Sequence, residues 1–222
     1  DAASIWEKAV AERELGLMEG PFQRGHFDEK FGHGKWRPLV RFCVQQADGK
    51  ARVIDDGKSC GTNEAVALDE RIHCCCIGSA LTAARFLYRH LGVPLAGRRA
   101  MLMSIHDMKR AFRQIAVRTD QLAFSVVAVW DPTAERWTFW QLKAMPFGLK
   151  AAVIEFNRIS VNIVALARRF LAIPLLGYYD DFAVLQLAGS GGSATQAFKG
   201  LMSLIGWMFD PVKDRPERTS VG

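Results

Sequence analysis

Two adjacent carboxylates, Asp180 and Asp181, stand between the short, largely apolar runs Leu175–Gly177 and Ala183–Leu185. Apolar runs on either side of a tight polar pair predict a β-hairpin with the aspartates at its turn. Two like charges this close together cost free energy unless a positive charge neutralises them. A divalent metal ion is the usual neutraliser, and Mg²⁺ binds a few carboxylate oxygens and completes its shell with water and substrate phosphates. A magnesium site for phosphate chemistry would also need a third carboxylate, an anion-binding surface and a nucleotide pocket.

Asp107 supplies a third carboxylate. It comes shortly after Met101–Ile105, a largely apolar run that predicts a buried strand, and before Met108–Ile115. An aspartate at the end of a core strand, where the chain turns away, is well placed to point into a cleft. Taken alone, Asp107 is explained equally well as the cap of the following helical turn. For Asp180 and Asp181 the corresponding alternative is an ordinary polar hairpin turn.

Five segments of the chain resemble, in the same order, the motifs of reverse transcriptases. Residues 107–115 (DMKRAFRQI) resemble motif A, residues 145–152 (MPFGLKAA) resemble motif B, and residues 178–181 (YYDD) resemble the Tyr-x-Asp-Asp box of motif C. Residues 46–56 with Asn63 are similar to the fingers hairpin, and residues 204–209 with Lys213 are similar to motif D. The resemblance covers most of the chain and is to RNA-directed DNA polymerases of retrotransposon type.

The resemblance implies nucleotidyl transfer, in which a primer 3′-hydroxyl displaces pyrophosphate from a deoxynucleoside triphosphate. Two Mg²⁺ ions, with Mn²⁺ as a possible substitute, activate the attacking oxygen and stabilise the leaving one in such a reaction. Asp107 and Asp180 are the implied metal-bridging pair, and Asp181 is a less direct member of the cluster. Lys213 is the implied proton donor to pyrophosphate. The implied partners are an RNA or DNA template with its primer, and dNTP substrates.

Basic residues are expected on the triphosphate. Lys50 and Arg52 adjoin the turn at Asp48–Gly49, and the forked guanidinium and the compact ammonium both suit phosphate oxygens. Lys35–Arg37 is a competing candidate, and solvated hairpin charges are the plainer interpretation of each residue alone. The resemblance also places Lys150, at the start of the helix after motif B, near the nucleotide.

Phe112 lies five residues after Asp107, which the resemblance identifies as the steric-gate position against a ribose 2′-hydroxyl. Plain core packing explains this aromatic residue equally well. Pro146 and Gly148 bracket Phe147 and predict a bent backbone that approaches the nucleotide closely. The expected nucleotide-binding residues are therefore Lys50, Arg52, Phe112, Phe147, Gly148, Lys150, Tyr178 and Tyr179.

Charge and composition bear on the partner of the protein and on its cellular compartment. The 222 residues include 29 basic and 23 acidic ones, and residues 71–170 hold 15 of the basic against 5 of the acidic. Concentrated positive charge favours a nucleic-acid partner, although a net charge of +6 fits an ordinary basic surface too. No apolar run reaches the roughly 20 residues of a membrane span, and no signal peptide is visible. Five cysteines, three of them consecutive, indicate thiols in a reducing compartment. We expect an intracellular protein, cytoplasmic or nuclear rather than secreted, that is part of a longer polyprotein.

The expected elements make an α+β fold. Helices are expected over residues 4–18, 62–70, 77–91, 149–170 and 194–205, and strands over residues 38–46, 51–55, 101–106, 122–130, 136–142, 175–179, 182–187 and 207–209. The resemblance makes residues 101–216 a palm, a ferredoxin-like antiparallel sheet with helices on one face, into which a fingers hairpin is inserted at about 120–143. Residues 1–34 are expected to be a helix and a loop, residues 35–100 fingers, and residues 217–222 a tail. Thumb and ribonuclease H segments are expected to be absent.

We therefore expect a reverse transcriptase fingers–palm fragment. Two alternatives stay open: a non-catalytic nucleic-acid-binding module derived from a polymerase, and a polymerase that synthesises RNA.

Overall fold

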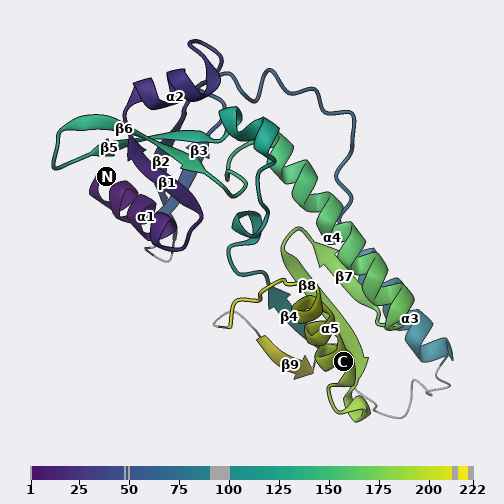
Figure 1. Cartoon of the computed structure of the whole chain (residues 1–222). Coiled ribbons are helices and arrows are strands. Elements are labelled where there is room, and N and C mark those ends of the chain that lie inside the picture. Colours follow the sequence, from purple (N-terminus) through teal and green to yellow (C-terminus); the bar gives the residue numbers. More distant parts are fainter. Residues whose placement is uncertain (1, 48, 50, 91–100, 212–214, 220–222) are drawn as a thin grey trace. The chain divides into compact units, whose positions relative to one another are not determined.

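The computed structural model describes residues 2–47, 49, 51–90, 101–211 and 215–219, which form two compact units (Figure 1). Unit 1 comprises Asp1–Glu70 and Phe112–Ile154, and unit 2 comprises Arg71–Ala111 and Glu155–Gly222. Each unit combines helices with a sheet of its own, so the chain is an α+β protein, as expected. The two units are described one after the other.

Unit 1 contains a five-stranded sheet in the order β1-β6-β5-β2-β3. Its strands are β1 (Met18–Phe22), β2 (Leu39–Gln45), β3 (Ala51–Asp56), β5 (Val126–Asp131) and β6 (Arg136–Leu142). Both expected hairpins, β2–β3 and β5–β6, are confirmed, and the first pairs Arg41 directly with Asp55. Because β2 runs parallel to β5, this sheet is mixed rather than wholly antiparallel.

Helices pack against this sheet through two separate clusters. Ala9 of α1 (Ala2–Glu14) belongs to a cluster with Val127, and Phe27 of α2 (Arg24–Phe31) belongs to a cluster with Val126. Successive residues of a strand point to opposite faces, so α1 and α2 cover opposite sides of β5. This explains why Val126 and Val127 are both fully buried and why β5 is a continuous apolar run.

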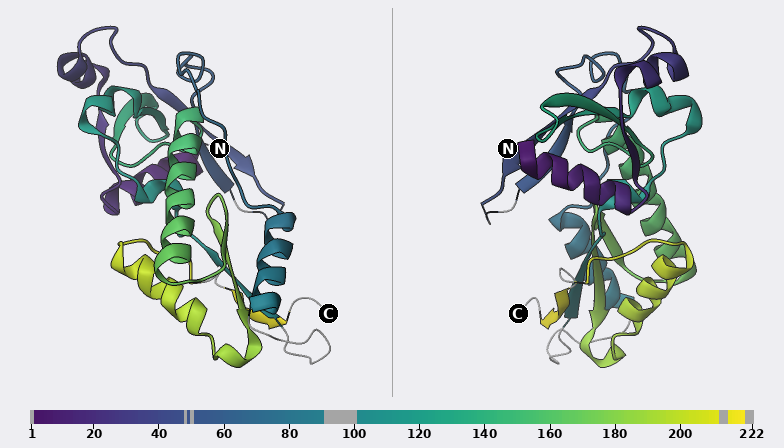
Figure 2. Two further views of the ribbon diagram at one scale, coloured as in Figure 1. Left: turned by 90° about the vertical axis from the view of Figure 1, so that its right-hand side faces the viewer. Right: turned by 60° about the vertical axis from the view of Figure 1, so that its left-hand side comes forward.

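Unit 2 contains a four-stranded antiparallel sheet in the order β7-β8-β4-β9. Its strands are β4 (Met101–Asp107), β7 (Leu175–Tyr178), β8 (Asp181–Leu187) and β9 (Arg215–Thr219). Leu176 and Leu185 pack against α3 (Ile77–His90), whereas Phe182 contacts Phe198 of α5 (Ser193–Leu204) on the opposite face. The ribbons of α3 and α5 accordingly lie on opposite sides of the strands (Figure 2). Helices therefore cover both faces of this sheet. The two helices within residues 101–216, α4 (Lys150–Phe170) and α5, lie on the face of Phe182, and α3, which comes from residues expected to be fingers, covers the other face.

The long helix α4 (Lys150–Phe170) begins in unit 1 and continues in unit 2, with bounds close to those expected. Its part in unit 2 packs closely on β7, because a Cβ atom on Gly177 would lie 2.8 Å from Cγ2 of Val164. Glycine at this position lets the helix approach the strand backbone. The expected helix over residues 77–91 is also confirmed as α3, although its last position lies outside the described residues.

Four sequence expectations are wrong. The chain between the first expected helix and residue 34 is not a loop, because it contains most of β1 and all of α2. Gly20–Pro21 resembles a turn, but β1 is an edge strand, where a proline that cannot donate a hydrogen bond is tolerated. Residues 62–70, all of them described, form no helix. Residues 207–209 make only an isolated bridge between Phe209 and Met108 rather than a strand, and β9 lies partly in the expected tail.

Among the residues that the structure describes, the helices are too short or too polar to cross a membrane.

Candidate functional site

The three candidate metal-binding aspartates are all in unit 2, where strand pairing relates them. β4 and β8 pair Asp107 with Asp181, and the hairpin β7–β8 pairs Tyr178 with Asp181. Directly paired residues of antiparallel strands point to the same face, with Cβ atoms about 4.5–5.5 Å apart. Tyr178, Asp181 and Asp107 therefore form a row across three strands. We call this row the carboxylate row, after its two aspartates. Tyr178 and Asp181 are exposed, and Asp107 is half-buried.

The direction of Asp107 follows from the alternation along β4. Ser104 and His106 are almost completely buried, and Ser104 Oγ lies 2.9 Å from both His106 Nε2 and the hydroxyl oxygen of Thr195 on α5. The even-numbered residues of β4 thus face α5. Asp107 is odd-numbered, so it points to the opposite face together with Met103, which packs near α3.

Asp180 lies in the two-residue turn between β7 and β8, and this turn is held on both sides. Tyr179 has a φ of 52°, a left-handed conformation that is uncommon for a bulky residue. The hydroxyl of Ser160 on α4 donates to the carbonyl of Tyr179 at 2.6 Å, and the N–H of Met108 donates to the carbonyl of Asp180 at 3.1 Å. The turn therefore adjoins the end of β4 that carries Asp107.

The chain after Asp107 is fixed by the segment that resembles motif D. The N–H of Lys109 donates to the carbonyl of Met208 at 2.9 Å, and the N–H of Asp210 donates to the carbonyl of Asp107 at 2.9 Å. These backbone bonds tie residues 208–210 to the end of β4, although residues 207–209 are not a strand.

The donor chemistry of the carboxylate row suits Mg²⁺. Mg²⁺ at phosphate sites is held by one or two carboxylates, with water and substrate phosphate oxygens as its other ligands. Asp107 and Asp181 supply two carboxylates on one face, and Asp180 stands beside them in the turn. Within the described residues, no three His, Cys, Asp or Glu side chains are already gathered into a group that could hold a metal. The register places Asp181, rather than Asp180, directly opposite Asp107, and the metal-bridging roles stay predictions.

A cavity of about 280 Å³ adjoins the turn on the side of α4. Tyr179, Ser160, Asn157 and Arg168 are among its lining residues. The Asn157 side chain accepts from the N–H of His73 at 3.1 Å and donates to the carbonyl of the same residue at 3.2 Å, so it holds one wall of the cavity in place.

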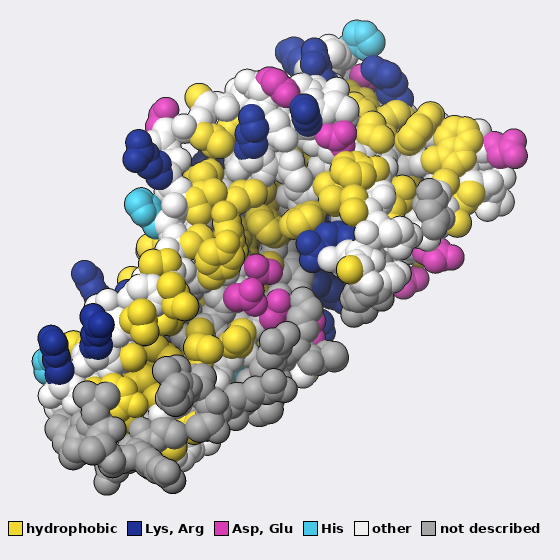
Figure 3. Space-filling view, turned by 180° about the vertical axis from the view of Figure 1, so that it is seen from behind, with side chains coloured by type: hydrophobic (Ala, Val, Ile, Leu, Met, Phe, Trp, Pro, Cys, Tyr) yellow, Lys and Arg dark blue, Asp and Glu magenta, His cyan; other side chains and the backbone are white. Residues whose placement is uncertain are grey.

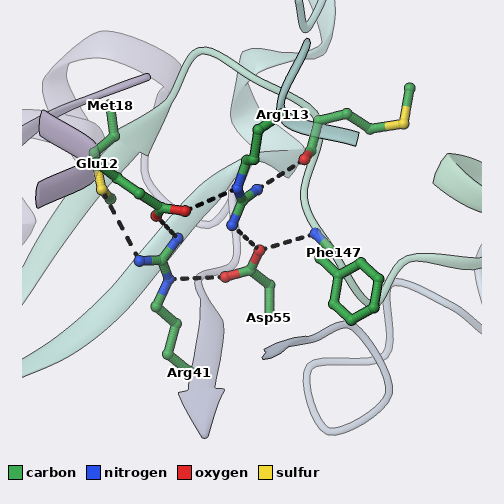
Figure 4. A network of polar contacts seen from close by, with 7 residues as sticks. Glu12, Met18, Arg41, Asp55, Arg113 and Phe147 are labelled. Atoms are coloured by element: carbon green, nitrogen blue, oxygen red, sulfur yellow. Dashed lines mark hydrogen bonds and ion pairs between the residues drawn. The ribbon is translucent and has the colours of Figure 1, made fainter. Parts of the chain in front are cut away.

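Unit 1 contains a buried network of four charges that sequence reasoning did not identify (Figure 4). Arg41 donates to Asp55 at 2.8 Å and to Glu12 at 2.6 Å, and Arg113 donates to Glu12 at 3.0 Å and to Asp55 at 2.8 Å. Two guanidinium groups and two carboxylates thus alternate in a closed ring, which we call the charge ring. The side chains of Arg41 and Asp55 are fully buried, and those of Glu12 and Arg113 are at most 10% exposed.

The charge ring favours the ionised forms of Asp55 and Arg41. Burial by itself raises the pKa of Asp55, but Arg41, Arg113 and the N–H of Phe147 outweigh it, so this pKa lies below its ordinary value. Burial lowers the pKa of Arg41, while Asp55 and Glu12 raise it, and the balance lies above the ordinary value. One signal was present in the sequence. Arg41 occupies an inward position of the apolar strand β2, and a buried charge requires a partner.

The charge ring ends on the segment that resembles motif B. Oδ2 of Asp55 accepts from the N–H of Phe147 at 3.0 Å, and the N–H of Asp55 donates to the carbonyl of Phe147 at 2.8 Å. The backbone of Gly148 is so close to β3 that an added Cβ atom would lie 2.1 Å from the carbonyl oxygen of Asp55. The Asn63 side chain donates to the carbonyl of Gly148 and accepts from the N–H of Lys150, at the first residue of α4. The bent backbone expected from Pro146 and Gly148 is present, with a φ of 135° at Gly148.

Three expected nucleotide-binding residues meet at this segment. The rings of Phe112 and Phe147 lie 5.3 Å apart and nearly perpendicular, and the Arg52 guanidinium lies over the Phe147 ring at 5.5 Å. Both rings are half-buried, and Arg52, Gly148 and Lys150 are exposed. The contact is compatible with a steric gate and with plain packing of Phe112.

The expected site residues thus fall into two groups. Unit 2 holds Asp107, Tyr178, Tyr179, Asp180 and Asp181, and unit 1 holds Arg52, Phe112, Phe147, Gly148 and Lys150. Lys50 and Lys213 lie outside the described residues. On the face shown in Figure 3, the basic side chains are spread out and a group of acidic side chains stands among them.

The chain was compared with protein families and with curated proteins, and no family model and no curated protein matches it.

Proposed function

We propose that this chain is the fingers–palm part of an RNA-directed DNA polymerase that adds dNTPs to a primer 3′-hydroxyl. The observation that carries the proposal is the pairing of Asp107 with Asp181, with Asp180 in the adjoining turn. Residues 74 positions apart in the chain are thereby brought onto one face of a sheet, as a carboxylate site for phosphate chemistry requires.

The connectivity of unit 2 gives a second argument. Its elements follow the order β4, α4, β7, β8, α5, β9, and its sheet has the order β7-β8-β4-β9. This is the β-α-β-β-α-β arrangement of ferredoxin-like folds, which the resemblance implies for a palm. The additional helix α3 is a departure from the simplest form of that arrangement.

Each group of residues has a distinct task in the proposed reaction. Asp107, Asp180 and Asp181 would hold two Mg²⁺ ions, which supply activation of the 3′-hydroxyl and stabilisation of the leaving pyrophosphate when bound. Arg52, with Lys50 and Lys150, would neutralise the triphosphate. Phe112 would pack against the sugar and disfavour a 2′-hydroxyl, and Lys213 would protonate the leaving pyrophosphate.

A primer-extension assay tests the proposal. The chain is given a labelled primer on an RNA or a DNA template, Mg²⁺, and either dNTPs or NTPs. We expect growth with dNTPs and none after Asp107→Asn or Asp180→Asn. Asp120→Asn, which removes an exposed carboxylate paired with Arg118, is the matched control and is expected to leave extension intact.

The other outcomes identify the alternatives. Extension with NTPs alone would favour an RNA-synthesising polymerase. Salt-sensitive binding of primer–template without extension, unchanged by Asp180→Asn, would favour a non-catalytic binding module.

A further inference from the structure

The charge ring of unit 1 holds Phe147, the residue that contacts Phe112 and Arg52, and also Met145, two positions before it. Nη1 of Arg113 donates to the carbonyl of Met145 at 2.7 Å. The carboxylate of Asp55 accepts from the N–H of Phe147, and the N–H of Asp55 donates to the carbonyl of Phe147. Two residues of the segment, Met145 and Phe147, are therefore held by side chains or backbone of ring residues.

We propose that Glu12, on α1, is a positioning residue of the nucleotide site. It fixes Arg113, and through Arg113 and Asp55 it sets the place of Phe147. The inference rests on the proposed function, and it adds an element that none of the motif-like segments contains. Glu12 lies in the first helix, 101 positions before Arg113 in the chain.

The geometry explains why Glu12 cannot be replaced by its neutral counterpart. Its Oε2 accepts from Arg41 at 2.6 Å and its Oε1 accepts from Arg113 at 3.0 Å, so one carboxylate serves two guanidinium groups. A glutamine has only one acceptor oxygen, and its amide N–H₂ would face a second donor. The ring would then hold two positive groups against Asp55 alone.

Because the charge ring is buried, the excess of positive charge in Glu12→Gln is expected to displace one of its side chains. Water cannot reach the charge ring in enough quantity to solvate an extra positive charge, because Arg41 is fully buried and Arg113 is 10% exposed. Arg113 is the more accessible of the two, so it is the one expected to turn away. Its departure would free the carbonyl of Met145 and loosen Phe147.

Loosening Phe147 should weaken nucleotide binding more than the chemical step. The residues that carry the reaction in the proposed function, Asp107, Asp180 and Asp181, take no part in the charge ring. A rise in KM with little change in kcat is the mark of lost binding that is common to the ground state and the transition state.

The test compares three variants of the full chain: Glu12→Gln, Arg113→Lys and the control Val129→Ala. Val129 is 1% exposed and packs in the same cluster as α1, but it makes no bond to the charge ring, so its truncation lowers stability only. We expect Glu12→Gln to raise the KM for dNTP about tenfold and to change kcat less than about threefold. Arg113→Lys should do the same, and Val129→Ala should lower Tm with KM unchanged. A KM that stays at the wild-type value in Glu12→Gln, or that rises equally in Val129→Ala, would overturn the inference.

Amide hydrogen exchange separates this inference from the proposed function. The N–H of Phe147 is bonded to Asp55, so Glu12→Gln should speed its exchange at least about tenfold, while the amides of β5 and β6 keep their protection. If the wild-type chain extends no primer, the proposed function fails, and faster exchange at Phe147 would still support the positioning. Unchanged exchange at Phe147 would refute it in either case.

Discussion

Gly148→Ala tests how closely the segment that carries Phe147 is seated on β3. The added Cβ atom would lie 2.1 Å from the carbonyl oxygen of Asp55 and 3.1 Å from Cγ2 of Ile54. The backbone oxygen cannot move aside without disturbing the pairing of β2 with β3. The φ of 135° adds strain for any residue with a side chain. The clash and the strain together are expected to cost at least ~3 kcal/mol of unfolding free energy.

Gly16→Ala is the matched control. Gly16 also has a positive φ, 72°, but an added Cβ atom there would meet nothing within 4 Å. Its substitution should cost only the conformational strain, about 1–2 kcal/mol. The difference between the two variants measures the close approach at Gly148 together with the greater strain of its φ of 135°.

Urea unfolding followed by tryptophan fluorescence is a suitable assay, because five of the six tryptophans belong to unit 1. A loss of ~3 kcal/mol corresponds to a decrease in Tm of roughly 6–12 °C for a protein of this size. Equal losses in Gly148→Ala and Gly16→Ala would refute the reasoning, because the segment could then not lie against the backbone of Asp55.

Three further predictions concern the charge ring, the turn and the sugar contact. The pKa of Asp55 is lowered in the folded protein, so the ring stabilises unit 1 above the ordinary carboxyl pKa, and this stabilisation is lost as pH falls through the folded-state value. The Tm of the wild type should therefore fall more steeply with acidification than that of Asp55→Asn, and parallel curves would contradict this. Ser160→Ala removes the bond to the carbonyl of Tyr179 and should cost about 0.5–1.5 kcal/mol and slow primer extension. Ser190→Ala removes a similar bond, to the carbonyl of Leu187 away from the turn, and should leave extension unchanged. Phe112→Val should raise NTP use relative to dNTP at least about tenfold if Phe112 is a steric gate, and an unchanged ratio with a lower Tm would identify it as a packing residue.

Elements with local signals were predictable from the sequence. The hairpin β7–β8 follows from apolar runs around a polar pair, and α4 follows from a long periodic stretch that ends before Pro174. The strand β1 was not predictable in this way, because its Gly20–Pro21 step has the composition of a turn, and only its edge position makes that composition acceptable.

Some features of the candidate site could also be predicted from the sequence, and others could not. The grouping of Asp107 with Asp180 and Asp181 was expected from motif order, and the strand register gives it a structural basis. Of the two partners of Arg41, Asp55 lies on the other strand of the expected hairpin. Glu12 could not be predicted, because the position of its helix relative to β2 is set by the tertiary fold. A charged residue at an inward strand position signals that a partner exists but not where it is.

The polar character of the charge ring has a structural reason beyond stability. Replacing a buried ion network by apolar side chains of similar volume is often neutral or stabilising, so four buried charges are not explained by the strength of their attraction. An apolar cluster could join α1 to β2 and β3 equally well. It could not satisfy the carbonyl of Met145 and the N–H of Phe147, which are bonded to Arg113 and Asp55. Within the described ranges of the chain, the backbone bonds of this half-buried bend leave these two groups without backbone partners, and an unpaired backbone group away from water costs free energy comparable to a lost hydrogen bond. Glu12 and Arg41 are then required because they neutralise Arg113 and Asp55, the two residues whose side chains hydrogen-bond to the bend.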